Sequence, residues 1–416
     1  MLDLIIIGAG HAGLSASRTA AAAGLEHLVL EKGDVGQTWR SQRWDSFTMN
    51  TPNAMNPLAG SPYEGAEPEG FEHRDEWVSR LERYASDHAL PLRRRTEVTA
   101  VEQDEGGFVV RTQRDRLSAR NVIVASGSLT TPKLPAAART LDPRIERIAA
   151  GGYRNPAQLP PGAILVVGSG QSGVQIAEDL LDAGREVYLS TSQVARAPRR
   201  LRGRDVFVWL DEIGWWDQGP ADLPDPAMRF WPNPQISGVG RTGHTVSLQW
   251  LAARGAHLLG RLESADGPRV RMAADLAQHI AFADAASRRM RAQVDEHITR
   301  RGIAAPASEP DPADEPVADP GRFAAPAELD LVDRGVRSAI FSSGFSAYLS
   351  WLRVPTLDDR GAPIHIAGRS PVDGLWFLGL QWQRKRKSGI IWGMSEDSTE
   401  VVSQVLERAR SSAGPR

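Results

Sequence analysis

"LIIIGAGHAGLSAS" (residues 4–17) and "VVGSGQSGVQIAEDLLDAGREVYLSTS" (residues 166–192) share one pattern: an apolar run, the spacing G-x-G-x-x-G, and a helical stretch. In this pattern the first glycine permits a tight turn, the second lets the backbone approach a pyrophosphate, and the third lets helix and strand pack closely. The amides at the start of the helix then receive the phosphate charge. Each stretch therefore predicts a strand–turn–helix unit that binds a dinucleotide.

The first unit carries an acid where an adenosine ribose needs one. Glu31 lies 18 residues beyond Gly13, at the end of the second predicted strand, and is placed to accept hydrogen bonds from the ribose. The first unit therefore suits the adenosine of FAD. Its predicted parts are a strand over residues 4–7, the glycines Gly8, Gly10 and Gly13, a helix that ends near Gly24 and a strand over residues 27–30.

The second unit lacks this acid. Its second strand runs into hydroxyl side chains and then arginines, which favour a 2′-phosphate where a carboxylate would repel it, so we expect NADPH rather than NADH. Whether these arginines bind the phosphate or only form a solvated face is left open. The predicted parts are strands over residues 163–167 and 186–189, Gly168, Gly170, Gly173, a helix through Ala183, the hydroxyls of Ser190, Thr191 and Ser192, and the arginines Arg196, Arg199 and Arg200.

Two such units side by side would let a nicotinamide hand a hydride to a flavin. The alternation of strands and helices predicts an α/β fold with parallel sheets: two Rossmann-like dinucleotide-binding domains, for FAD and NADPH, the second inserted in the first. The predicted boundaries are residues 1–155 for the first part of the FAD domain, 156–327 for the NADPH domain with a Trp-rich insertion at about 203–327, 328–410 for the second part of the FAD domain, and 411–416 for a disordered tail.

The segment between the two units carries a family resemblance. "VGQTWRSQRWDSFTMNTPNAMNPLAG" (residues 35–60), together with both glycine patterns, closely resembles the class B flavin-dependent monooxygenases, which include flavin-containing monooxygenases and Baeyer–Villiger enzymes. The resemblance implies cofactor contacts from Lys32, Gln37, Trp39, Arg40, Trp44, Gly127, Gln171, Ser172, Ser388 and Gly389, in addition to the glycines, the acid, the hydroxyls Ser190 and Thr191, and the arginines Arg196 and Arg199.

The resemblance also implies residues that shape the flavin environment. Asn50 matches an asparagine near the reactive C4a position, where an amide donor would steady developing negative charge. The other reading of Asn50, a turn-forming residue beside Pro52, stays open. Arg40 and Arg384 are the further candidates for a catalytic role.

Other segments extend the resemblance over most of the chain. Residues 122–129, 340–352 and 374–401 resemble family segments that return to the flavin, the last with a helix start near Ser388 and Gly389. Two positions depart from the family: Ala149 stands where a fingerprint histidine is usual, and Arg384 replaces a histidine of many relatives. These departures leave the nucleotide sites intact and weaken the analogy for substrate oxygenation.

The function implied by the resemblance is an NADPH- and FAD-dependent monooxygenase. NADPH would reduce FAD, and a C4a-(hydro)peroxyflavin would deliver one oxygen atom of O2 to a small organic substrate by N-oxidation, S-oxidation or Baeyer–Villiger insertion. Two alternatives remain open: an NADPH oxidase or diaphorase that releases peroxide, and a silent FAD-binding regulator. A disulfide reductase is excluded, because the chain has no cysteine.

Composition and charge limit the partners and the cellular location that we expect. The formal charge of -2 argues against a nucleic-acid partner, and no stretch approaches the ~20 apolar residues of a membrane span. The short apolar start predicts no signal peptide, so we expect a cytoplasmic protein. Scattered histidines predict no metal site.

The region from residue 203 to 327 is rich in tryptophan. Such a cluster forms an apolar pocket, a homodimer face or a small satellite core, and the sequence leaves these open. Residues 272–300 predict an amphipathic helix, residues 305–328 an extended connector, and the end of the chain a disordered tail. The tryptophans are Trp209, Trp215, Trp216, Trp231 and Trp250.

Overall fold

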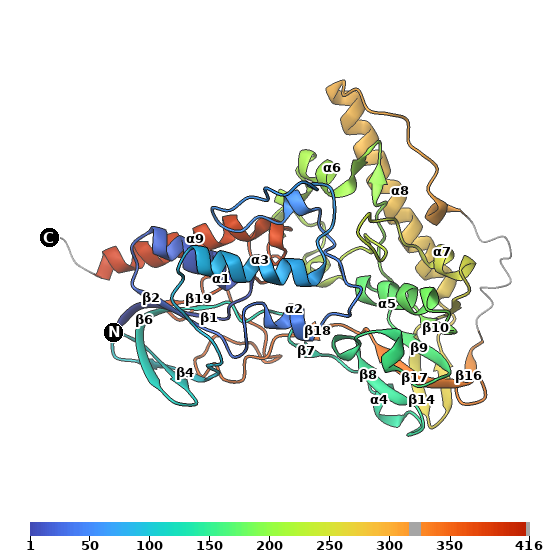
Figure 1. The fold of residues 1–416 in the computed structure, drawn as a ribbon, viewed down its shortest axis with the longest axis horizontal. Coiled ribbons are helices and arrows are strands. Elements are labelled where there is room, and N and C mark those ends of the chain that lie inside the picture. The colour runs from blue at the N-terminus through green and yellow to red at the C-terminus, as the bar shows by residue number, and fades with distance from the viewer. Residues whose placement is uncertain (316–325, 413–416) are drawn as a thin grey trace.

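Two mainly parallel sheets form the framework of the computed structural model, which describes residues 1–315 and 326–412 (Figure 1). In the first sheet β1 lies between β2 and β6, and Ile5 is in register with Leu28 on one side and Val122 on the other. β4 and β5 form an antiparallel edge of this sheet, and β19 pairs in parallel with the C-terminal end of β6. The strands are β1 (Leu2–Ile7), β2 (His27–Leu30), β3 (Leu92–Arg93), β4 (Val98–Asp104), β5 (Gly107–Thr112), β6 (Arg116–Val124) and β19 (Leu375–Phe377).

The second sheet has five strands in the order β13-β10-β9-β17-β8, and every neighbouring pair is parallel. Its strands are β8 (Glu146–Ala149), β9 (Ala163–Val167), β10 (Val187–Ser190), β13 (His257–Leu259) and β17 (Val336–Phe341). This arrangement confirms the predicted α/β fold with two Rossmann-like units. The domain boundaries predicted at residues 156 and 328 are wrong, because β8 precedes the first boundary and β17 follows the second, yet both pair within the second sheet.

The chain crosses between the two sheets at a single place. The outgoing strand β7 (Thr131–Pro132) pairs antiparallel with the returning strand β18 (Phe345–Ser346). The amide of Lys133 also donates to the carbonyl of Gly344 at 2.9 Å. The second sheet and its helices therefore form one continuous insert between Pro132 and Phe345.

The region predicted as a Trp-rich insertion is only partly separate from the second nucleotide fold. Helix α7 (Leu248–Ala253) lies against α5, and β13 is an edge strand of the second sheet, so these parts complete that fold. The predicted amphipathic helix is confirmed as α8 (Leu276–Arg301). The remaining strands are β11 (Arg200–Leu201) with β12 (Arg204–Asp205), and the antiparallel set β14 (Leu262–Asp266), β15 (Arg269–Met272) and β16 (Glu328–Asp330).

Helices cover the sheets. Against the first sheet, α1 packs on both α3 and α9. Helix α9 continues to Ser412, which corrects the tail predicted to begin at residue 411; residues 413–416 lie outside the described residues. The other helices are α1 (His11–Ala22), α2 (Gln37–Ser41), α3 (Arg74–Asp87), α4 (Ala137–Thr140), α5 (Gln171–Asp182), α6 (Val206–Glu212) and α9 (Ile391–Ser412), and the short 3-10 turns are η1 (Asn53–Met55), η2 (Ala150–Gly152), η3 (Pro156–Gln158), η4 (Trp215–Asp217), η5 (Pro220–Asp222), η6 (Pro226–Phe230) and η7 (Pro312–Asp314).

The predicted connector over residues 305–328 is partly outside the described residues, which stop at 315 and resume at 326. Its first part is packed rather than extended. Ala313 in η7 is 1% exposed, and Asp314 pairs with Arg196 at 2.6 Å. The acidic side chains of this segment therefore fasten it to the second nucleotide fold.

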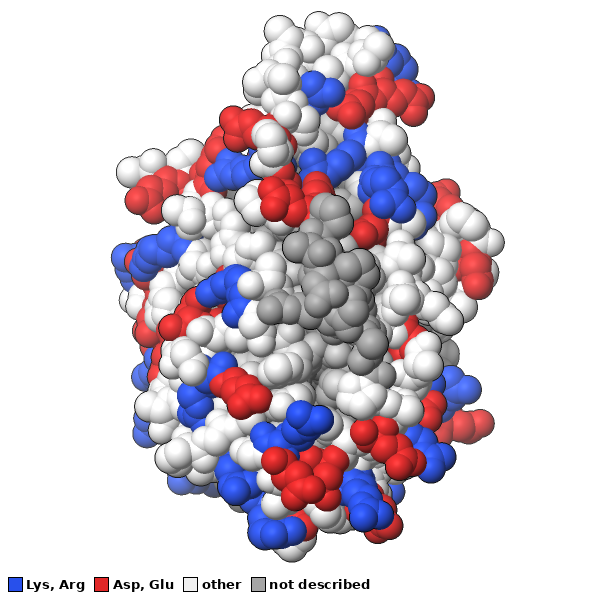
Figure 2. Space-filling model, turned by 90° about the vertical axis from the view of Figure 1, so that its right-hand side faces the viewer, with Lys and Arg blue, Asp and Glu red and all other residues white. Residues whose placement is uncertain are grey.

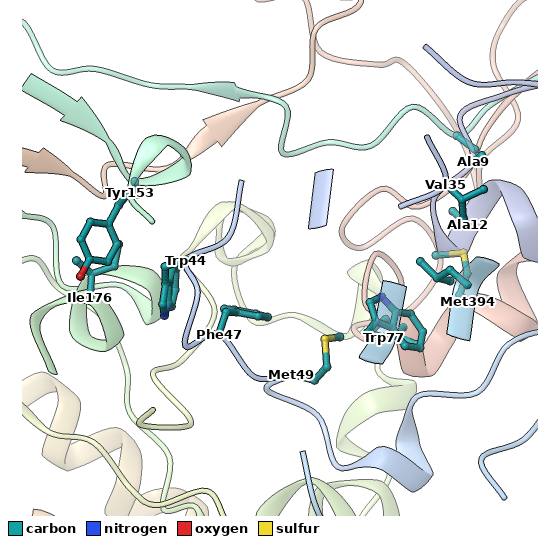
Figure 3. Close-up of a cluster of buried hydrophobic side chains, with 14 of the residues drawn as sticks. Ala9, Ala12, Val35, Trp44, Phe47, Met49, Trp77, Tyr153, Ile176 and Met394 are labelled. Carbon is teal, nitrogen blue, oxygen red and sulfur yellow. The ribbon is translucent and has the colours of Figure 1, made fainter. Parts of the chain in front are cut away.

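One buried cluster joins the two nucleotide folds. Figure 3 shows this cluster running from Tyr153 and Ile176 in the second fold, through Trp44, to Ala12 and Met394 in the first. Burial of apolar area stabilises such a core by about 25 cal/mol per Å². The two folds therefore share one core and hold a defined relative position.

The surface shows no dominant charge on the side that Figure 2 presents, where basic and acidic side chains are interspersed around the second fold. None of the helices in the described residues is both long and apolar enough to cross a membrane.

Candidate active site

A cleft opens at the carboxyl ends of β1, β2, β6 and β19, the edge of a parallel sheet where nucleotides bind. The predicted cofactor residues that line it are Gly8, Gly10, Glu31, Lys32, Gln37, Trp39, Gly127 and Gly389.

The first glycine turn has the shape that a pyrophosphate needs. Gly8 has φ +109°, and a Cβ added to Gly13 would lie 1.8 Å from the carbonyl oxygen of Gly8, so helix and strand touch there. A Cβ added to Gly10 would meet nothing within 4 Å, which leaves room for a ligand. Helix α1 has no side-chain cap at Gly10, so its first amides remain available to phosphate oxygens.

Glu31 forms one wall of the cleft. Its carboxylate is 7% exposed and accepts the amide of Ala9 at 2.7 Å on one oxygen and that of Gly33 at 2.8 Å on the other. Each carboxylate oxygen keeps a second lone pair. The glycine turn therefore holds the acid in place and leaves it able to accept ribose hydroxyls.

Three predicted contacts lie outside this cleft. The Arg40 guanidinium pairs with Glu82 at 2.6 Å on helix α3. Trp44 is 2% exposed and packs in the core between the two folds. Ser388 is 1% exposed, and its hydroxyl accepts two backbone amides of its own turn. The predictions of direct cofactor contact are therefore wrong for these three side chains, because each is used inside the protein.

Sequence reasoning missed several ionisable residues of the cleft, among them His11 and Arg43. His11 is the first residue of α1, and its buried Nε2 has no hydrogen-bond partner in the part of the chain that the structure describes. Burial lowers its pKa from 6.5 to about 4. Arg43 lines the cleft three residues after Arg40. Both lie in motifs read from the sequence, and the position of His11 between the motif glycines was the available signal.

Other residues of the cleft were not predicted one by one, although several lie in the segments over residues 122–129, 340–352 and 374–401 that carry the family resemblance, because separate loops bring them together only in the fold. They follow β3, β6, β18 and β19 or lie at the start of α1. They are Ala12, Thr96, Glu97, Val98, Ser126, Ser128, Leu129, Thr130, Tyr348, Trp351, Leu378 and Gly379.

The second glycine turn repeats the first. Gly168 has φ +98°, and a Cβ added to Gly173 would lie 1.8 Å from the carbonyl oxygen of Gly168. Gly170 has open space and caps α5 without a side chain. Ser172 is half-buried in the first turn of α5. This turn therefore offers the same cradle for a second pyrophosphate.

The hydroxyls after β10 are not open to a ligand. The Ser190 hydroxyl donates to the carbonyl of Gly260 at 3.0 Å, and the Thr191 hydroxyl donates to that of Leu259 at 2.8 Å. Both residues are 1% exposed. Their predicted contact with a 2′-phosphate is wrong, because they tie β10 to the strand beside it.

The two arginines assigned to the 2′-phosphate are also engaged. Arg196 pairs with Asp284 at 2.9 Å and Asp314 at 2.6 Å, and its side chain is 4% exposed. Arg199 and Asp205 are completely buried and lie 2.6 Å apart. The prediction that these arginines bind a phosphate is wrong, because acids from distant segments already neutralise Arg196 and the nearby Asp205 neutralises Arg199.

A loop over residues 235–240 lies along the start of α5. The Gln171 amide donates to the carbonyl of Ser237 at 2.6 Å and accepts the amide of Ile236 at 2.7 Å. The Val239 amide donates to Glu178 at 2.8 Å. Gln171 therefore positions this loop beside the second turn, which corrects its prediction as a direct cofactor contact.

Asn50 lies where the two folds meet. Its Oδ1 accepts the side-chain amide of Gln175, on α5, at 3.0 Å. Its carbonyl accepts Arg199 Nη1 at 2.8 Å. The residue is half-buried, so its amide nitrogen stands between the first fold and the second nucleotide helix.

Arg384 faces helix α9 instead of the cleft. Its guanidinium lies 3.4 Å from Asp397, 3.6 Å from Glu396 and 3.6 Å from Glu400. Within the described residues it is therefore part of an acidic cluster on α9, and its predicted catalytic role is wrong.

The tryptophans of the insertion divide between small buried clusters and the surface. Trp216 is 6% exposed and stacks on Phe207 with ring centroids 4.7 Å apart, whereas Trp209 is fully buried in a separate cluster. Trp231 is 49% exposed. Most of these tryptophans therefore belong to small satellite cores, which is one of the three interpretations that the sequence left open.

Comparisons with known proteins agree with this geometry. A model of the pyridine nucleotide-disulphide oxidoreductase family matches residues 5–210. The chain is 28% identical over 408 residues to a Bacillus subtilis (strain 168) protein named uncharacterized oxidoreductase CzcO, covering 97% of this chain and 99% of that protein.

Solved structures share the whole fold. A flavin-containing monooxygenase from Stenotrophomonas maltophilia superposes with a TM-score of 0.67 at 18% identity, covering 98% of this chain and 99% of that one. OTEMO, solved in complex with FAD and NADP, gives a TM-score of 0.55 at 14% identity, covering 99% of this chain and 86% of that one. The two glycine cradles of this chain have the shape to hold the pyrophosphates of two such dinucleotides.

Proposed function

We propose that this chain is a flavin-dependent monooxygenase that takes a hydride from NADPH into FAD and places one atom of O2 on a small organic substrate. The observation that carries the proposal is the pair of nucleotide turns in one shared core. They are built alike but differ at the residue that follows the second strand of each unit, which is Glu31 after β2 in the first fold and Thr191 after β10 in the second. An acid suits the ribose of FAD, and its absence suits the 2′-phosphate of NADPH.

The chain's own residues bind and orient the cofactors. The free amides of α1 would hold the FAD pyrophosphate and Glu31 would hold its ribose, whereas the amides of α5 would hold the pyrophosphate of NADPH. FAD, when bound, supplies the capacity to accept a hydride and to activate O2. The protein's task is to place the two rings together and to keep bulk water away from them.

Of the predicted candidates, we propose that Asn50 has the catalytic role. Its Oδ1 accepts the side-chain amide of Gln175 on α5, so the residue lies where the first fold meets the helix of the second nucleotide turn. An amide fixed by Gln175 donates to developing negative charge without the cost of reorienting, which is the basis of preorganised electrostatic stabilisation. The substrate classes that suit such an enzyme are amines, sulfides and ketones.

Rapid mixing tests this function. The FAD-loaded protein is reduced with NADPH without oxygen and then mixed with oxygenated buffer, while the absorption spectrum and released peroxide are followed. We expect a transient near-ultraviolet band distinct from oxidised and reduced flavin, and less than one peroxide per NADPH when a good substrate is present.

Two other results would assign a different function. Direct return to oxidised flavin with one peroxide per NADPH, for every amine, sulfide and ketone tried, would identify an oxidase. A bound flavin that NADPH does not reduce would identify a binding protein without turnover.

A further inference from the structure

Arg43 is a cation of the flavin cleft with no acid beside it. Its Cζ lies 5.0 Å from the ring centroid of Trp39 and 5.5 Å from that of Phe47, and its Nη1 donates to the carbonyl of Gln42 at 2.9 Å. In residues 1–315 and 326–412 no carboxylate lies within ion-pair distance of its guanidinium. A guanidinium has five N–H donors, so most of its capacity is unused.

Two neighbouring arginines, unlike Arg43, each have an acidic partner. Arg40 pairs with Glu82, and Arg74 pairs with Asp45 at 2.9 Å. Burial of Arg43 lowers its pKa from 12.5 to about 10, so it stays charged at neutral pH. A half-buried charged side chain without a partner destabilises the folded protein. Such a side chain is found at functional sites, where a ligand supplies the opposite charge.

The position of Arg43 identifies the end of the cleft. The next residue, Trp44, packs in the shared core with Tyr153 and Ile176 of the second fold (Figure 3). Two residues further, the Ser46 hydroxyl donates to Asp179 of α5 at 2.6 Å. Arg43 therefore lies at the end of the cleft nearest the second nucleotide, away from the ribose acid, where a flavin and a nicotinamide ring meet for hydride transfer.

We propose that Arg43 is the cation that stabilises the negative charge of the reduced flavin and so raises its reduction potential. The inference rests on the proposed function, because it assumes that the flavin is reduced in this cleft. Reduction by two electrons and one proton leaves one negative charge on a flavin ring. A guanidinium already desolvated and held against Trp39 interacts with that charge more strongly than it would in water.

The test compares three variants of the FAD-loaded, full-length protein. Arg43→Gln removes the charge, Arg43→Lys keeps it, and Arg40→Gln removes a charge three residues away that is paired outside the cleft. The readout is the two-electron midpoint potential against a reference dye. We expect Arg43→Gln to weaken reduced-state stabilisation about tenfold, a fall of about 30 mV, with Arg43→Lys within threefold of the parent and Arg40→Gln unchanged.

Several results would overturn the inference. An unchanged potential in Arg43→Gln would do so. Where FAD dissociates from that variant, the dissociation constants of the apoprotein for oxidised and for dithionite-reduced FAD give the same ratio, and an equal loss for both would assign Arg43 to the pyrophosphate instead.

The inference can still be tested when the variant Arg43→Gln does not fold. Should Arg43→Gln not fold, a tenfold change in Arg43→Lys, which keeps the charge, would contradict the inference. Oxygen insertion is not needed for any of these measurements. A chain that only releases peroxide would therefore refute the proposed function and leave the inference about Arg43 intact.

Discussion

The guanidinium of Arg386 lies between the indole rings of Trp215 and Trp382, with its Cζ 3.8 Å and 4.5 Å from the two ring centroids. Trp215 belongs to the insertion, whereas Arg386 and Trp382 belong to the closing segment of the first fold. The side chain also donates to Gln218 at 2.7 Å, and its backbone amide donates to the carbonyl of Gln218. This stack therefore clamps the insertion onto the flavin-binding half.

Replacing Arg386 by Met should loosen this clamp. Each cation–π contact is worth about 0.5–2 kcal/mol, so we expect amides of residues 215–219 to exchange with deuterium about fivefold faster or more. Arg114→Met, at an exposed arginine in the loop between β5 and β6, is the control. Unchanged exchange in residues 215–219 would show that other contacts hold the insertion.

Two glycine substitutions in the second turn should have different effects. Gly170→Ala meets open space, so the protein should fold with its normal Tm and keep FAD while its reduction by NADPH slows at least tenfold, since the methyl group fills the pyrophosphate cradle. Gly173→Ala forces a contact of 1.8 Å and should lower Tm or abolish folding. Normal NADPH reduction in Gly170→Ala would contradict the assignment of this turn.

Glu31→Gln should weaken FAD binding about tenfold or more. The neutral amide loses charge-assisted hydrogen bonds to the ribose and cannot accept the amides of Ala9 and Gly33 on both of its heavy atoms. Calorimetric titration of the apoprotein with FAD measures the loss, with Glu105→Gln on the exposed β4–β5 turn as the matched control. Equal affinities for the two variants would remove Glu31 from the site.

The coenzyme preference should not depend on Arg196. Arg196→Gln breaks the pairs with Asp284 and Asp314 and should lower Tm by several degrees, because it leaves acids without their cation. We expect the ratio of kcat/KM for NADPH to that for NADH to stay within twofold of the parent. A tenfold fall in this ratio, without a matching loss of stability, would restore Arg196 to the 2′-phosphate site.

The FAD-free protein should lose stability in mild acid through His11. Its pKa is about 4 in the folded chain and 6.5 when unfolded, so the unfolded state binds more protons between these values. Stability therefore falls as pH drops from 6.5 to 4, by at most about 1.4 kcal/mol per pH unit. Denaturant titrations of the parent and His11→Gln should diverge over this range, and parallel curves would contradict the prediction.

Local motifs explain what could be predicted from the sequence. Gly8, Gly13 and Glu31 work through contacts within one strand–turn–helix unit, so their spacing along the chain determines their geometry. The predicted strands of both units lie where expected for the same reason. Steric fit at a turn is a short-range property, and it is visible in a few consecutive residues.

The errors come from partners that are distant in the chain. The sequence leaves Arg196 available because its partners Asp284 and Asp314 are 88 and 118 residues away. Asp205 is only six residues from Arg199, but the sequence does not show that the β11–β12 hairpin brings the two together. The sequence predicts a role for Arg40 and none for Arg43, because the end of a short helix does not reveal which of its side chains meets the cleft. The boundaries at residues 156 and 328 failed because strand order in a sheet is decided by pairing.

The ribbon of β7 and β18 has a consequence for the ancestry of the molecule. Because the chain leaves and re-enters the flavin-binding half at hydrogen-bonded neighbours, Pro132 and Phe345, the whole intervening fold is a cassette with adjacent ends. One recombination event can insert, delete or exchange such a cassette, because the strand order of the first sheet stays the same. The glycine turn of this cassette repeats the geometry of the first turn, so host and insert are built on the same strand–turn–helix unit.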